Sequence, residues 1–315
     1  MSIRGLSVVL AVIVSCAMPQ GLAAETLKIA SPIRGSWEGA IPELGQQAGI
    51  FRKYGLDLDI LYTQGGGETL QVVMSGSVDI GLSAGALGSL GAYGKGAPLR
   101  IIGASSTGSR ETFWWVAAKS PLRSMREVDG QSIAYSTTGA SSHTTVLRFI
   151  SEYGLKARPM ATGDVPGTIT QVMSGQVDVG WSVAPFVLDL LSTGAARMIG
   201  RASDIAAIRE QTIRVQITNA SNLAAKKDAF GRYRTAYNET VNWMYSSAEA
   251  VPRYLAFSGL SEPAVRLMLK EFIPKESLQT EKIMGLGESM KDAVQFKFLS
   301  APLSETQLEE LIQIP

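Results

Sequence analysis

Two stretches of this chain repeat each other at an offset of 99 residues: VMSGSVDIGLS at residues 73–83 and VMSGQVDVGWS at residues 172–182. They agree at 8 of 11 positions, and the same offset pairs Tyr54-Gly55-Leu56 with Tyr153-Gly154-Leu155. A chain of 315 residues is long enough to bury two linked cores. The repeat therefore predicts two lobes built on one plan.

Each copy has the pattern of an α/β unit, with strands and helices separated by glycine. Ser141 or Ser142 can cap a helix whose apolar residues recur at helical spacing, and Gly154 provides its stop. In the first copy we expect a helix over residues 69–75, followed by an apolar strand over residues 78–82. The predicted fold class is α/β.

The predicted cleft lies beyond the carboxyl ends of the strands, where open α/β sheets bind ligands. The loops that start at Ser31, Ser83, Tyr135 and Ser182 should therefore face one shared cleft. Glycine-rich turns that lead into helix N-termini present backbone N–H groups and the positive end of the helix dipole. This arrangement suits a carboxylate, a sulfonate or another oxyanion.

Two crossings between the lobes are expected, one over residues 104–116 and one over residues 205–222. Two crossings permit closure by rotation. They divide the chain into lobe 1 (residues 25–110 and 215–315, with C-terminal helices) and lobe 2 (residues 111–214).

The first 24 residues have the pattern of a signal peptide, with Arg4, a short apolar run and a small-residue cleavage zone. We therefore expect export to the periplasm and no membrane-spanning segment in the mature chain. Cys16 is the only cysteine and lies in this leader; the alternative is lipoprotein processing, which would leave Cys16 lipidated. The balance of 29 Lys+Arg against 28 Asp+Glu argues against a nucleic-acid partner.

A set of motifs in fixed order resembles one family over essentially the whole mature chain. The motifs are Leu27–Ala30, Gly49–Leu56, Gly76–Ile80, Gly139–His143 and Gly175–Val179. They resemble the alkanesulfonate, taurine and nitrate type of ABC-transporter substrate-binding proteins, which includes binders of aromatic carboxylates and of thiamine-pyrimidine precursors. The resemblance implies a type II periplasmic-binding-protein fold, a ligand held between the lobes, and a closed form that docks on a membrane permease.

The resemblance also implies four ligand-facing loops. Carried over by position, they consist of Arg34, Gly35, Ser36, Trp37, Ser83, Ala84, Gly85, Thr137, Thr138, Gly139, Ala140, Ser141, Val183, Ala184 and Pro185.

Several of these residues allow two interpretations. Arg34 is either an oxyanion clamp or a surface arginine, and Trp37 is either a pocket wall or a core anchor. Trp181 either shapes the cleft or fills the core. For Arg110 and Arg214, which lie at the proposed crossings, hinge salt bridges are favoured over anion contacts.

The sequence predicts a binding protein rather than an enzyme. His143 is the sole histidine, and we interpret it as structural because no nucleophile or orienting carboxylate stands near it in sequence. Asp79 and Asp178 occupy equivalent places in the two copies, so we expect each to bond backbone within its own lobe.

We expect a monomer without catalytic residues, metal or cofactor that delivers a small organic anion to an ABC permease. The alternative is an exported enzyme on the same bilobal fold, either a dehydratase or a relative of pyrimidine-precursor synthesis. The choice among an alkanesulfonate, taurine, nitrate, an aromatic carboxylate and a pyrimidine precursor stays open.

Overall fold

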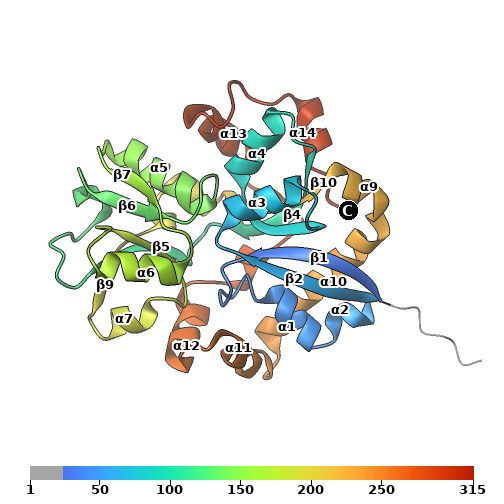
Figure 1. Cartoon of the computed structure of the whole chain (residues 1–315), viewed down its shortest axis with the longest axis horizontal. Helices are drawn as coiled ribbons and strands as arrows, with labels where there is room; N and C mark the ends of the chain where they lie inside the picture. The colour runs from blue at the N-terminus through green and yellow to red at the C-terminus, as the bar shows by residue number, and fades with distance from the viewer. Residues whose placement is uncertain (1–23) are drawn as a thin grey trace, which may run out of the picture.

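The computed structural model describes residues 24–315, which form two α/β lobes side by side (Figure 1). The predicted leader and its Cys16 lie outside the described residues, except for Ala24. The first lobe is built on a five-stranded sheet in the order β2-β1-β3-β10-β4. Its strands are β1 (Glu25–Pro32), β2 (Leu56–Thr63), β3 (Ile80–Gly85), β4 (Leu99–Thr107) and β10 (Thr212–Asn219).

The second lobe holds two smaller pieces of sheet. One has the order β8-β5-β9, with β5 (Thr112–Ala117), β8 (Gly180–Val183) and β9 (Ala196–Arg201). The other pairs β6 (Ser132–Tyr135) with β7 (Arg158–Ala161), and a parallel bridge from Ile133 to Val179 joins the two pieces. The helical elements of the second lobe are η1 (Met125–Glu127), α5 (Ser141–Tyr153), α6 (Val165–Met173), α7 (Leu188–Ser192), η2 (Ala202–Asp204) and α8 (Ala206–Arg209).

The remaining helices belong to the first lobe and to the C-terminal part of the chain. They are α1 (Ile41–Gln47), α2 (Ile50–Lys53), α3 (Gly66–Met74), α4 (Ala86–Gly94), α9 (Ala220–Ala225), α10 (Lys227–Ser246), α11 (Ala250–Ser258), α12 (Glu262–Glu271), η3 (Lys275–Leu278), α13 (Leu286–Gln295) and α14 (Glu305–Leu311). Within residues 24–315, no helix combines the length and the hydropathy needed to cross a bilayer.

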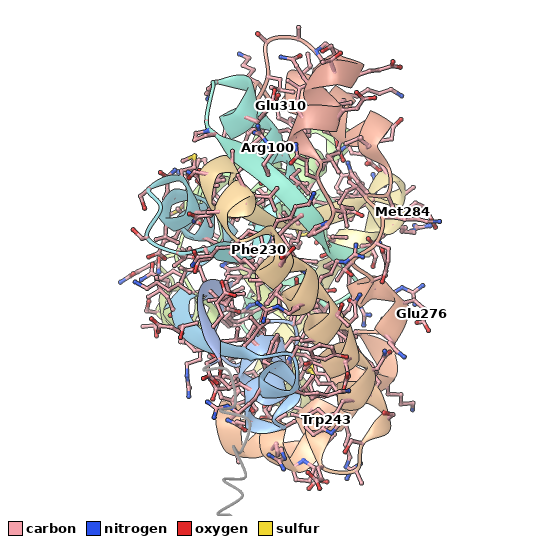
Figure 2. All side chains as sticks on the ribbon, turned by 90° about the vertical axis from the view of Figure 1, so that its right-hand side faces the viewer. Arg100, Phe230, Trp243, Glu276, Met284 and Glu310 are labelled. Atoms are coloured by element: carbon pink, nitrogen blue, oxygen red, sulfur yellow. The ribbon has the colours of Figure 1, made fainter. Side chains whose placement is uncertain are left out.

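The C-terminal helices pack mainly on the first lobe, but Ser261, the N-cap of α12, also bonds to Asp189 on α7 of the second lobe. Tyr237, Val241 and Met244 on α10 are buried, and this helix packs against α1 and α2. At the other end of the lobe, Arg100 on β4 points toward Glu310 on α14, and the two form an ion pair of 2.5 Å (Figure 2). These contacts hold both ends of the C-terminal segment on the first sheet.

Local signals explain where the repeated helices end. Gly76 after α3 and Gly154 after α5 have φ of +75° and +65°, a conformation that only glycine adopts without cost. The prediction that Ser141 or Ser142 caps α5 is wrong, because the N-cap is Ala140 and makes no side-chain cap. Ser142 Oγ instead accepts a hydrogen bond of 3.0 Å from Ser136 N and shapes the loop before the helix.

The two crossings are present, and the lobes also contact each other away from the crossings. The chain leaves β4 through Gly108 and Ser109, both with positive φ, and returns through α8 into β10. Between the lobes, Gly67 N donates to Thr137 Oγ1 at 3.0 Å, and Arg148 Nε donates to Asp292 Oδ2 at 2.9 Å. The structure is therefore a closed arrangement.

Candidate functional site

A cavity lies between the lobes, at the carboxyl ends of β1, β3, β6 and β8. Its lining comes from both lobes and from both crossings, and consists of Pro32, Ile33, Ser36, Trp37, Glu38, Gly66, Ser83, Glu111, Thr112, Ser136, Ala140, Ser141, Ser142, Trp181, Val183, Ala184, Arg214 and Ile273. The four loops that the sequence directs to one cleft do meet here.

The cavity is narrow in this closed arrangement. The volume that remains free inside it is about 30 Å³. This is far below the volume of about 300 Å³ or more that pockets for drug-sized ligands have. A larger solute requires the lobes to part before it can enter.

Three ionisable side chains line the cavity, and all three are buried. Arg214 on β10 pairs with Glu38, with Nη2 and Oε2 3.0 Å apart, and with Glu111 at the outbound crossing. The exposed fractions are 7% for Glu38, 3% for Glu111 and 6% for Arg214. Two carboxylates therefore share one guanidinium in a site with little water.

Burial and mutual charge shift the protonation of this group. Burial raises the pKa of the Glu38 carboxyl above its ordinary value; Arg214 opposes this effect, whereas Glu111 adds to it. Burial alone would lower the pKa of Arg214, but the two carboxylates together raise it, so the guanidinium stays charged. Ser83 Oγ donates a hydrogen bond to Glu38 Oε1, which ties the end of β3 to this cluster.

Two hydrogen-bonding atoms of the cluster are left over. Within residues 24–315, the buried Glu111 Oε2 accepts no hydrogen bond, and the buried Arg214 Nε donates none. Buried polar atoms without partners are uncommon in folded proteins because each costs free energy. Trp37 Nε1, in another lining residue, also lacks a partner within these residues, so the lining residues include one buried acceptor and two buried donors without partners.

Aromatic and aliphatic side chains form the walls. Trp37 and Trp181 are exposed by 0% and 1% and contribute from opposite lobes. Trp37 packs edge-on against Tyr254 and Tyr245, with ring centroids 4.8 and 5.8 Å away. Trp181 Nε1 donates to Thr162 Oγ1 at 3.2 Å. Both tryptophans therefore combine the core and cavity roles that the sequence left open.

The sequence-predicted ligand residues divide into two sets. Seven line the cavity: Ser36, Trp37, Ser83, Ala140, Ser141, Val183 and Ala184. The others lie outside the lining: Arg34, Gly35, Ala84, Gly85, Thr137, Thr138, Gly139 and Pro185. Arg34 is exposed and lies over the rings of Phe257 and Tyr62, with its guanidinium carbon 4.7 and 5.9 Å from their centroids. Here Arg34 makes surface cation–π contacts.

The glycine and threonine positions outside the lining serve contact between the lobes. A Cβ on Gly85 would overlap Gly139 O, and a Cβ on Gly67 would overlap Thr138 O. These glycines let the loop after β6 approach the starts of α3 and α4. They are part of the closure surface rather than of the cavity wall.

His143 lies outside the lining of the cavity. Its Nδ1 accepts from Gly139 N at 3.3 Å, and its ring lies 4.4 Å from that of Tyr135. Burial lowers its pKa below the ordinary value. The structural interpretation of His143 therefore fits its position in the first turn of α5.

Sequence reasoning missed Glu38 and Glu111. Arg214 forms the expected hinge salt bridge, but its partners come from sites 176 and 103 residues away in the chain. A usable signal was present: Glu38 follows the predicted ligand loop directly, and Glu111 stands among small and apolar residues at the outbound crossing. Arg110, the neighbour of Glu111, is exposed.

The fold and its interlobe cavity define the class of two-lobed, type II periplasmic-binding-protein folds. The solved alkanesulfonate-binding protein SsuA from Xanthomonas axonopodis pv. citri, bound to MOPS, has a TM-score of 0.78 at 18% identity; the match covers 92% of this chain and 98% of SsuA. The periplasmic nitrate-binding protein NrtA from Synechocystis PCC 6803 gives 0.67 at 13% identity, over 92% and 86% of the two chains.

The desulfurization enzyme DSZB also matches, with a TM-score of 0.63 at 14% identity, over 91% of this chain and 99% of the enzyme. One fold thus serves binding proteins and an enzyme. A comparison with curated protein sequences gives no match. The sequence profile described as NMT1/THI5 like matches residues 43–250, and the chain belongs to that family.

Proposed function

We propose that this chain is the periplasmic solute-binding component of an ABC importer. It captures a small organic acid of the sulfonate or carboxylate type between its lobes and delivers it unchanged to a membrane permease. The carrying observation is the cavity itself, which draws its lining from both lobes and both crossings. A solute held there binds only when the lobes close, so it stabilises the closed form.

Donor groups in the cavity support an acid group on the solute. Ser36, Ser136 and Ser141 contribute hydroxyls to the lining, and the N-terminal turn of α5 adds the positive end of a 13-residue helix. The free N–H of Arg214 Nε supplies a charged donor in the same cavity. The walls formed by Trp37 and Trp181 suit a short apolar body.

The rival function is catalysis on the same fold, which the DSZB match represents. The described lining contains serines, one threonine and carboxylates but neither histidine nor cysteine. Its serine at the end of β3, Ser83, donates to Glu38, which is already paired with Arg214. The carboxylate beside Ser83 is therefore engaged in an ion pair, which argues against Ser83 as an activated nucleophile.

The test is a screen of small sulfonates and carboxylates by tryptophan fluorescence and thermal shift, followed by mass spectrometry of the released solute. We expect a ligand with a Kd of about 1 µM or tighter, released with unchanged mass. Conversion of the solute to a product would favour the enzyme. Absence of any binding in the screen would contradict the proposal.

A further inference from the structure

The charges around the cavity do not match those of a simple anion trap. Among the described lining residues, Glu38 and Glu111 carry carboxylates and Arg214 carries the single guanidinium. The guanidinium is already paired with both carboxylates. A solute with only an acid group would bring a third negative group into a site where little water is left to solvate it.

The unpartnered oxygen of Glu111 indicates which kind of group on the solute would bond to it. Glu111 is 3% exposed, and its other oxygen, Oε1, accepts from Arg214, Ser109 and Thr112. Oε2 has no donor within residues 24–315. A buried carboxylate oxygen in a binding cavity is satisfied by a hydrogen-bond donor, and it is satisfied best by a charged one.

A donor on the solute would satisfy Glu111 Oε2. The hydroxyls of Ser109 and Thr112 already lie on the Oε1 side, at 3.3 and 3.2 Å. The guanidinium group that remains free, Arg214 Nε–H, is a donor suited to an acid group. The cavity thus places one free acceptor and one free donor in the same cluster.

We propose that the solute carries an N–H donor nitrogen, such as an ammonium or an amidine-type group, in addition to its acid group, and that Glu111 selects for it. This inference rests on the proposed function. The nitrogen donates to Glu111 Oε2, and the acid group accepts from Arg214 Nε and from the hydroxyls of the lining. The solute's positive charge offsets its own acid group, so such a solute adds no net charge to the closed cavity, whereas a simple acid adds one negative charge.

The experiment compares matched pairs of solutes that differ only by an amino group, with the whole chain and isothermal titration calorimetry. The pairs are taurine with ethanesulfonate, and β-alanine with propionate; ethylamine supplies the nitrogen without the acid. We expect the amino member of at least one pair to bind at least 10-fold more tightly than its partner, which corresponds to one charge-assisted hydrogen bond. Ethylamine alone should bind more weakly than that amino acid or amino sulfonate.

The variant Glu111→Gln tests the residue itself. It keeps the size of the side chain but removes the charge, so we expect the preference for the amino member to fall about 10-fold or more. Glu276→Gln is the matched control, because the same chemical change is made there at an exposed residue that does not line the cavity (Figure 2). The control should keep the full preference of the parent chain.

The outcomes separate this inference from the proposed function. If the simple acids bind as tightly as their amino partners, solute capture stands and the role of Glu111 is refuted. If no member of any pair binds, both proposals fail for these solutes. If Glu111→Gln does not fold, the comparison of pairs on the parent chain still decides the inference.

Discussion

The two copies of the repeat share a frame and differ at the cleft. In both, an aspartate accepts a hydrogen bond from the backbone of a neighbouring strand: Asp79 Oδ2 from Lys28 N at 2.9 Å, and Asp178 Oδ2 from Ser132 N at 2.8 Å. In both, two threonines six residues apart join their hydroxyls, at 2.7 Å for Thr63 and Thr69 and at 2.6 Å for the counterparts 99 residues later.

The loops after the first strand of each copy show the difference. At an offset of 104 residues, Gly35 corresponds to Gly139, and both have positive φ. Three positions later Glu38 stands in the first copy and Ser142 in the second. Ser142 bonds within its own loop, whereas Glu38 reaches Arg214. The two copies therefore share the contacts that hold the frame, but only the first contributes a charged side chain, Glu38, to the cavity.

The charged cluster gives the largest expected effect. Arg214→Met would leave Glu38 and Glu111 buried without their guanidinium, and we expect the free energy of unfolding to fall by about 3–5 kcal/mol. Chemical denaturation measures this loss. Arg34→Met serves as the control, since Arg34 is exposed, and should leave stability essentially unchanged. Equal losses in the two variants would show that the cluster does not stabilise the fold.

Closure of the lobes can be blocked by replacing a glycine of the first copy with the residue that stands at the equivalent position of the second copy. Gly85 corresponds to Ala184 at the 99-residue offset. In Gly85→Ala the new methyl would overlap Gly139 O, so we expect closure to cost about 1–3 kcal/mol more and solute affinity to fall about 10- to 100-fold. Small-angle scattering should show a larger radius of gyration. Gly231→Ala, where no atom lies within 4 Å of the new methyl, should keep the compact form.

Because the two copies share the aspartate contacts, we expect similar losses of stability when either aspartate is removed. Asp79→Ala and Asp178→Ala each remove the acceptor of a strand N–H group, and we expect about 1–2 kcal/mol of destabilisation from each. Asp79 also pairs with the half-exposed Lys226 at 2.8 Å, which adds little. Denaturation curves should therefore nearly coincide. A loss confined to one variant would break the equivalence of the two copies.

The smallest effect concerns pH. His143 has no counterpart in the first copy, where Gly39 occupies its place at the 104-residue offset. Its pKa is lowered in the folded chain, so below its ordinary value of 6.5 the unfolded chain binds the proton more readily. We expect stability to fall as the pH drops from 6.5 through the folded pKa.

The variant His143→Gln isolates this contribution. The raised pKa of Glu38 acts in the opposite direction, since its contribution is lost as the pH rises above its ordinary value of 4.5. Subtracting the stability of the variant from that of the parent chain at each pH removes the Glu38 term. A difference that stays constant from pH 7.5 to pH 5.5 would contradict the assignment to His143.

Much of the frame is predictable from sequence because its signals are local. The helix that ends before Gly76 and the strand that follows it occur where expected, with α3 beginning three residues earlier than predicted and β3 reaching Gly85. The repeat also brings the correct four loops to one cavity. Helix stops and buried strands depend on a few neighbouring residues, so one sequence is enough to locate them.

The charged part of the cavity is not predictable in the same way. Whether Glu38 is buried depends on β10, which lies 174 residues farther along the chain. Arg34 has a more conspicuous position in the ligand loop, yet it lies over surface aromatic rings because Phe257 and Tyr62 reach its side chain. Contacts between distant segments decide both outcomes, and a single sequence does not display them.

The position of β10 has a consequence for the order in which the molecule assembles. The strand pairs with both β3 and β4, so the first sheet has a gap until residues 212–219 are available. The second lobe is continuous in sequence and needs no such late segment. As the chain is synthesised from its N-terminus onward, the second lobe can fold first and the first lobe last. The first lobe therefore stays unfinished until about two thirds of the chain has been made.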